Sequence, residues 1–189
     1  MKPLAFIDVE TSGLHPEMGH EIIEICIIKK NDVLHLKIAP SNISLADPVA
    51  LKINGYQPEL WADATPRKLA AQLSASWLHG CMVVGHNIKF DMMFLADLWD
   101  SYDISSAVDR RYIDTVVLAH EHLAPLGLRS LSMDNIRNFF GWSSASAHSA
   151  LADAEDAKRL YYKLLKAPFW RRWFWWGCHK CFVWFGVKK

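Results

Sequence analysis

Hydrophobic residues in the first half of the chain fall into short runs, each ending in polar or turn-forming residues. Such runs predict buried strands at residues 4–9, 21–28, 33–38 and 81–84, the second and third forming a hairpin. Apolar positions three or four residues apart predict helices at 66–79, 90–100, 115–122, 131–140 and 149–166. Three opening strands followed by alternating helices and strands predict an α/β fold, with a central mixed β-sheet flanked by α-helices.

The composition divides the chain into two parts. A length of 189 residues with 51% hydrophobic residues excludes a disordered chain and favours one globular domain. Residues 168–189 contain nine aromatic side chains, five basic ones and no acid. The rest therefore has 21 − 5 = 16 basic residues against 20 acidic ones. We expect an acidic domain at residues 1–167 and a basic, Trp- and Phe-rich C-terminal extension at 168–189.

The extension allows three interpretations from its sequence. It packs on the domain or docks on a protein partner, it binds single-stranded nucleic acid through stacked aromatic rings, or it lies on a membrane surface. A membrane span is disfavoured because Lys180 lies near the middle, and a central Lys costs about 2.5–3.5 kcal/mol. Cys178 and Cys181 form a C-x-x-C pair without the second ligand pair of a structural zinc site.

The N-terminal segment indicates the compartment. Its apolar run is interrupted by Asp8 and Glu10, unlike that of a secretory signal. Cys26 and Cys81 lie in apolar runs and are interpreted as buried thiols rather than a disulfide framework. We expect a cytoplasmic protein, with peripheral membrane association through the extension as an alternative.

Acidic side chains follow several of the predicted strands and helix starts. Asp8 and Glu10 are two residues apart at a strand end, so both point to the same face. Asp91 follows the turn after the strand at 81–84, and Asp153 lies at the start of the last helix, five residues after His148. Taken singly, each is also typical of a solvated strand or helix end.

The combination of these residues suggests chemistry. Two carboxylates ~4 Å apart repel each other by about 4 kcal/mol at an effective dielectric constant of ~20, so a converging cluster requires cations. An all-oxygen ligand set selects Mg²⁺ or Mn²⁺. Two such ions can activate a water and stabilise the leaving oxygen in phosphodiester cleavage. The ordinary pKa of a histidine suits His148 to accept the proton of that water.

Three segments carry a family resemblance. FIDVETSGL, GHNIKFDMMFL and HSALADAEDA resemble, in the same order, the three motifs of the DEDDh subgroup of DnaQ-like 3′-to-5′ exonucleases. The resemblance covers roughly residues 4 to 166 and implies a ribonuclease-H-like fold.

The resemblance also implies a role for each matching residue. Asp8 bridges two divalent ions, Mg²⁺ or Mn²⁺, and Glu10 and Asp153 hold the ion on the nucleophile side. Asp91 supports the second ion, and His148 is the general base. No small-molecule cofactor is expected. The residues expected to contact the terminal nucleotide or line the substrate channel are Thr11, Ser12, Gly13, Leu14, His86, Asn87 and Phe90, with Leu14 as the wedge against the last base.

The predicted function is that of a metal-dependent 3′-to-5′ exonuclease that releases nucleoside monophosphates from single-stranded nucleic acid ends, with DNA slightly favoured over RNA. An RNA-trimming exoribonuclease of the RNase T or oligoribonuclease type is the alternative, since motif spacing does not reveal a contact to the 2′-hydroxyl. A catalytically silent nucleic-acid-binding module is disfavoured because the expected residue types fill all the catalytic positions.

Overall fold

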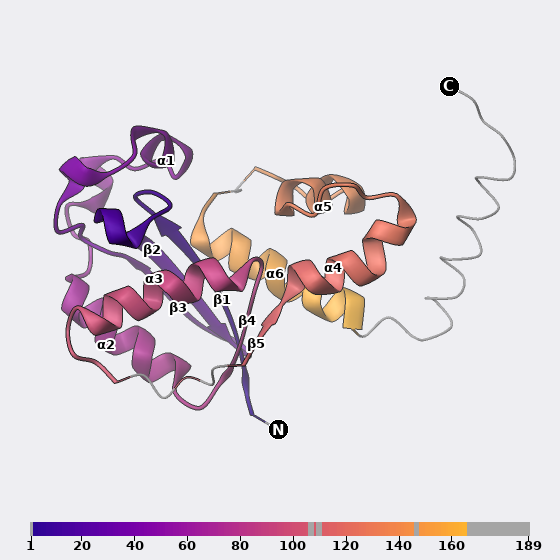
Figure 1. Ribbon diagram of the computed structural model, residues 1–189, viewed down its shortest axis with the longest axis horizontal. Coiled ribbons are helices and arrows are strands. Elements are labelled where there is room, and N and C mark those ends of the chain that lie inside the picture. Colours follow the sequence, from indigo (N-terminus) through magenta and orange to yellow (C-terminus); the bar gives the residue numbers. More distant parts are fainter. Residues whose placement is uncertain (1, 106–107, 109–110, 146–147, 166–189) are drawn as a thin grey trace, which may run out of the picture.

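A five-stranded mixed sheet forms the centre of the protein (Figure 1). The computed structural model describes residues 2–105, 108, 111–145 and 148–165. The strands are β1 (Leu4–Thr11), β2 (Ile22–Lys29), β3 (Asp32–Lys37), β4 (Met82–Gly85) and β5 (Tyr112–Asp114), in the order β3-β2-β1-β4-β5. The first three strands are antiparallel, and β4 and β5 extend the sheet parallel to β1. The predicted α/β architecture is confirmed.

The helices predicted from periodicity are also confirmed, with shifted ends. They are α2 (Arg67–Leu78), α3 (Ile88–Asp100), α4 (Thr115–Leu123), α5 (Met133–Phe140) and α6 (Ala150–Leu165). The start of α5 is explained by Ser132, whose side chain accepts a hydrogen bond from the Asn135 amide and caps the helix. Short 3₁₀ helices lie at Pro16–Met18, Ile43–Leu45, Pro58–Trp61 and Ala124–Leu126.

One strand and one α-helix were not predicted. The strand β5 has three residues, too few for a periodic pattern, and is defined by its parallel pairing with β4. The helix α1 (Pro48–Ile53) has six residues, too few for an apolar period to be recognised, and buries none of them. Local signals define its start, since the Asp47 carboxylate accepts a hydrogen bond from the Val49 amide at 2.7 Å, and Pro48 follows that cap.

The two faces of β1 pack against different helices. Ala5, Ile7 and Val9 belong to the core formed with α2 and α3. Phe6, on the opposite face, packs with residues of α6. Because side chains alternate along a strand, Asp8 and Glu10 continue the face of Phe6. The face of β1 on the α6 side therefore changes from apolar to acidic along the strand.

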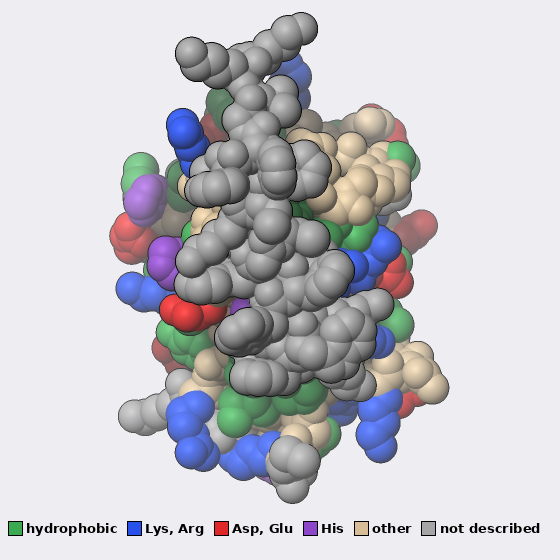
Figure 2. Space-filling view, turned by 90° about the vertical axis from the view of Figure 1, so that its right-hand side faces the viewer, with side chains coloured by type: hydrophobic (Ala, Val, Ile, Leu, Met, Phe, Trp, Pro, Cys, Tyr) green, Lys and Arg blue, Asp and Glu red, His purple; other side chains and the backbone are tan. Residues whose placement is uncertain are grey.

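A third core cluster joins α4, α5 and α6, and includes Ala119, Ile136, Trp142 and Leu160. Figure 2 shows the side of the molecule to the right of Figure 1, where basic, acidic and hydrophobic side chains of the described residues are interspersed. No helix within the described part of the chain is both long and apolar enough to cross a membrane. The predicted extension, residues 168–189, lies outside the described residues.

We expect Phe94→Ala to lower the free energy of unfolding by about 3–5 kcal/mol, the usual effect of emptying an aromatic site in a core. Phe94 lies in α3 and is 1% exposed. The neighbouring Met93→Ala is the matched control, because Met93 is 40% exposed, and surface substitutions change stability by no more than about 0.5 kcal/mol. Urea unfolding of both variants measures the two losses of stability. Equal losses would contradict the burial of Phe94 in the core beneath α3.

Candidate active site

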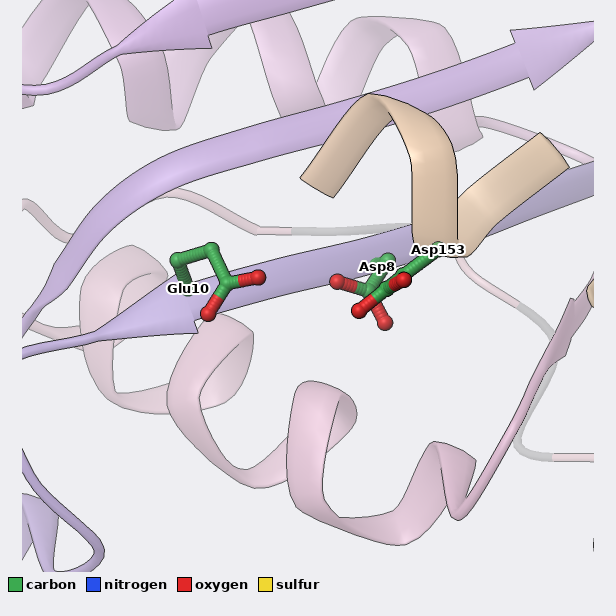
Figure 3. A group of neighbouring side chains, drawn as sticks. All are labelled: Asp8, Glu10 and Asp153. Carbon is green, nitrogen blue, oxygen red and sulfur yellow. The ribbon is translucent and has the colours of Figure 1, made fainter. Parts of the chain in front are cut away.

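Three carboxylates meet between β1 and α6 (Figure 3). Asp8, Glu10 and Asp153 each place one carboxylate oxygen within 4.8 Å of the others. Asp8 and Glu10 project from the same face of β1, and Asp153 reaches them from the first turn of α6. The convergence inferred from the sequence is therefore present for these three residues.

Asp91 approaches the same strand from α3 and is almost fully buried. Its Oδ1 accepts a hydrogen bond from the Val9 amide at 3.0 Å. That amide is available because β4 pairs with β1 only from Leu4 to Phe6. The carboxylate of Asp91 thus takes the place of a neighbouring strand and lies close enough for its charge to act on Asp8.

Burial and mutual repulsion keep protons on this cluster when no cation is bound. Burial, followed by the charges of Asp91 and Asp153, raises the pKa of Asp8 well above its ordinary value. The same causes, burial first and then the charge of Asp153, raise the pKa of Glu10 from 4.5 to about 8. Burial also raises the pKa values of Asp91 and Asp153. The clustered carboxylates are therefore stabilised either by bound protons or by bound cations.

His148 is exposed and lies just before α6. Its backbone is left-handed, with a φ of 64°, where the chain turns into the helix. The helix then begins with a hydrogen bond from the Asp153 amide to the Ser149 carbonyl at 3.0 Å. The charge of His148 acts on Asp153, which places the ring in electrostatic reach of the carboxylates.

The loop after β1 is held in a fixed shape. The Ser12 amide donates to the Glu21 carbonyl and the Ser12 hydroxyl accepts from the Glu21 amide, both at 2.8 Å. The Thr11 hydroxyl donates to the Gly13 carbonyl at 2.6 Å. A Cβ at Gly13 would lie 2.4 Å from the ring of His20, so a larger residue there would have to displace that ring. Leu14 is 62% exposed at the tip.

The second predicted group of substrate residues surrounds the start of α3. Both ring nitrogens of His86 are engaged, Nδ1 with the Thr115 hydroxyl and Nε2 with the Leu131 carbonyl. Burial of the ring lowers the pKa of His86. Asn87 is exposed, with a left-handed φ of 62°, and Phe90 is partly buried.

Asp114 supports this region through two backbone hydrogen bonds. Its Oδ1 accepts hydrogen bonds from the Asn87 amide at 3.0 Å and the Val116 amide at 2.8 Å. One carboxylate thereby caps α4 and fixes the turn that leads into α3.

Two buried charged residues beside the site were missed in the sequence. Glu24 lies on β2 opposite Glu10, and its Oε1 accepts hydrogen bonds from the Ala150 amide at 3.1 Å and from His35 at 2.8 Å. A single acid inside the apolar run of β2 was the available signal. Arg137 contacts Asp153 from α5, and no pattern in the sequence brings these two together.

The donor set of the cluster fits a hard divalent cation. Its oxygen ligands suit Mg²⁺ or Mn²⁺ better than zinc. The raised pKa values of Asp8 and Glu10 follow from burial and from the neighbouring carboxylates, which a bound cation would offset. Cys26 and Cys81, interpreted as buried thiols, are buried and free, whereas Cys178 and Cys181 lie outside the described residues.

Comparisons with known proteins identify an exonuclease family and DNA polymerase III proteins as relatives of this chain. A family model for exonucleases matches residues 5–161. The chain is 31% identical over 166 residues to the PolC-type DNA polymerase III of Thermotoga maritima, covering 85% of this chain but 12% of the polymerase. It is 30% identical to DNA polymerase III subunit epsilon of Rickettsia prowazekii, over 84% of this chain and 72% of that protein. It is 27% identical to ribonuclease T of a Shewanella species, over 82% and 78%.

Solved structures show the same fold. E. coli exonuclease I, in a zinc-bound complex with single-stranded DNA, superposes with a TM-score of 0.74 at 21% identity and covers 91% of this chain and 42% of its own. The shared architecture is the ribonuclease-H-like sheet with flanking helices. With the family model matched along most of its length, the chain belongs to the DnaQ-like family of 3′-to-5′ exonucleases.

Proposed function

We propose that this chain removes nucleoside monophosphates from the 3′ ends of single-stranded nucleic acid in a reaction that requires two divalent cations. The observation that carries the proposal is the cluster of Asp8, Glu10 and Asp153, whose oxygens lie within 4.8 Å of one another. Asp91, hydrogen-bonded to β1 beside them, completes the acidic set.

The cations would be held by these four carboxylates. Asp8 would serve both ions, Glu10 and Asp153 would hold the ion on the nucleophile side, and Asp91 would support the second. When bound, Mg²⁺ or Mn²⁺ would lower the pKa of the attacking water and neutralise charge on the leaving oxygen. Their charge would also remove the repulsion that otherwise keeps protons on the carboxylates.

His148 would accept the proton of the attacking water. Its exposed position just before α6 leaves the ring free to approach a nucleotide bound over the carboxylates. The loop of residues 11–14 would hold the terminal nucleotide, with the exposed Leu14 against its base. Asn87 and Phe90 would line the channel, and His86 would support it, since its ring nitrogens bind protein groups.

Single-stranded DNA is the substrate we favour. The relatives that support it are two DNA polymerase III proteins and an exonuclease solved with single-stranded DNA. A single strand also presents its last base without the energetic cost of unpairing it. Ribonuclease T, matched over most of its own length, supports RNA trimming as the second candidate.

The domain that performs this reaction would be residues 1–167. We propose the extension at 168–189 as an accessory that contacts a protein partner, the nucleic acid or a membrane surface, since its sequence combines aromatic and basic residues without an acid.

Asp8→Asn and Asp153→Asn should each slow the Mg²⁺-dependent shortening of a 5′-labelled single-stranded DNA by at least about 100-fold, because each removes a cation ligand. Gel electrophoresis of the products measures this. Matched RNA and duplex DNA should be degraded more slowly by the wild-type protein.

Asp32→Asn, which alters an exposed acid on β3, is the control and should retain wild-type activity. Near-normal activity of either site variant would refute the assignment of the carboxylates. Faster digestion of RNA than of DNA would favour the second candidate function.

His148→Gln should lower kcat by about 10²–10⁴-fold, the usual contribution of a general base. Its activity should also lose the rise with pH that accompanies deprotonation of an imidazole, while Mn²⁺ affinity is retained. Rates measured across pH at saturating Mn²⁺ test this, with His79→Gln, at the exposed end of α2, as the control. An unchanged pH profile in the variant would assign the proton to another group.

The protonation equilibrium of Glu10 should make the metal-free protein less stable as the pH rises. Because the pKa of Glu10 is raised from 4.5 to about 8 in the folded state, its stabilising proton is fully present below pH 4.5 and is lost as the pH rises through about 8. Glu10→Gln lacks this proton equilibrium. In EDTA, the free energy of unfolding of Glu10→Gln should therefore increase relative to that of the wild type as the pH rises over this range.

Urea unfolding at several pH values measures the difference. Adding Mg²⁺ at the alkaline end should stabilise the wild type more than Glu10→Gln, since the cation replaces the lost proton. A difference between the two proteins that stays constant with pH would contradict the raised pKa.

A further inference from the structure

Arg137 is a buried cation beside the acidic cluster. It lies on α5 and is 2% exposed. Its Nε donates to Oδ2 of Asp156 at 2.7 Å, and its Nη1 donates to Oδ1 of Asp134 at 2.9 Å. Its Nη2 donates to Oδ1 of Asp153. One guanidinium thus serves three carboxylates, two of them on α6.

The three carboxylates that bind Arg137 connect it to different parts of the protein. Asp134 is half exposed and lies one turn before Arg137 on the same helix. Asp156 lies on α6 outside the three-carboxylate group, so its bond with Arg137 connects the two helices. These two bonds would satisfy the guanidinium and join α5 to α6 without any contact with the active site.

The bond with Asp153 engages the active site itself. Asp153 is one of the three residues whose oxygens converge, and its charge repels those of Asp8 and Glu10. Without a counterion, this repulsion would favour rotation of the Asp153 side chain away from β1. The planar guanidinium holds one oxygen in a fixed direction, and the other remains available to a cation.

We propose that Arg137 is a positioning residue that holds the carboxylate of Asp153 in its cation-binding orientation. This inference rests on the proposed metal-dependent function and assigns Arg137 no contact with substrate. The role resembles that of groups that orient metal ligands in other proteins, where their loss usually weakens metal affinity or activity by about 10–100-fold.

The test is Mn²⁺ binding by Arg137→Lys, followed by electron paramagnetic resonance. Lysine keeps the charge but places all its donors on one flexible ammonium nitrogen, so it lacks the planar fork that reaches three carboxylates. We expect the dissociation constant for Mn²⁺ to rise by about 10–100-fold, with kcat for DNA cleavage largely recovered at saturating Mn²⁺. Circular dichroism and thermal melting establish that the variant is folded under the conditions of the binding measurement.

Two variants serve as controls. Arg159→Lys makes the same substitution at an exposed arginine of α6, which lies 4.1 Å from the ring centre of Trp142, and should bind Mn²⁺ like the wild type. Asp156→Asn weakens the connection of α5 to α6 without altering Asp153. It should lower the melting temperature and change the dissociation constant for Mn²⁺ far less than Arg137→Lys.

A second measurement uses the wild-type protein and does not depend on a variant that folds. In nitrogen-15 NMR spectra, the Nη2–H signals of Arg137 should remain protected from exchange with water when Mg²⁺ is bound, because the bond from Nη2 to Asp153 persists. Loss of that protection on adding Mg²⁺ would overturn the proposal.

Other outcomes distinguish a failure of the positioning role of Arg137 from a failure of the proposed metal-dependent function. A folded Arg137→Lys with a lower melting temperature but unchanged Mn²⁺ affinity would show that Arg137 only joins the helices and would overturn the positioning role alone. Equal loss of Mn²⁺ affinity in Asp156→Asn would overturn it as well. A wild-type protein that binds no Mn²⁺ would overturn the proposed function and this proposal together.

Discussion

The central position of β1 in the sheet determines where the chemistry of this protein lies. Side chains on a strand alternate between two faces, and on β1 one face is filled by the core with α2 and α3. The other face holds Phe6 under α6 and then Asp8 and Glu10. Because β4 pairs with only the first part of β1, the edge beside Val9 is open to Asp91. A single strand thus brings together acids from three elements.

This concentration of negative charge opposes folding unless something compensates for it. Protons do so in the metal-free protein, as the raised pKa values of Asp8 and Glu10 indicate. Arg137 compensates at the α6 side through Asp153. The backbone compensates through the Ala150 amide, which donates to Glu24 at the start of α6. A divalent cation replaces the protons in the proposed active state. The repulsion between carboxylates that destabilises the metal-free protein would therefore also give the site its affinity for metal.

The sequence predicted the parts of this arrangement that depend on local spacing. The two-residue separation of Asp8 and Glu10 placed both on one face of a strand, and the start of the last helix placed Asp153 after His148. Glu24 and Arg137 were missed because their roles arise from tertiary contacts, across the sheet in one case and between two helices in the other. The strand β5 was missed for a similar reason, since three residues form a strand only when β4 lies beside them.

The most direct test of the acidic cluster as a cation site is anomalous X-ray diffraction from crystals of the wild-type protein soaked in Mn²⁺. We predict an anomalous peak between Asp8, Glu10 and Asp153, about 2.1 Å from their oxygens, the distance usual for a small hard cation. A second peak nearer Asp91 would complete the proposed pair. A map with no anomalous density at these carboxylates, from crystals whose solvent channels reach β1 and α6, would contradict the metal-dependent function.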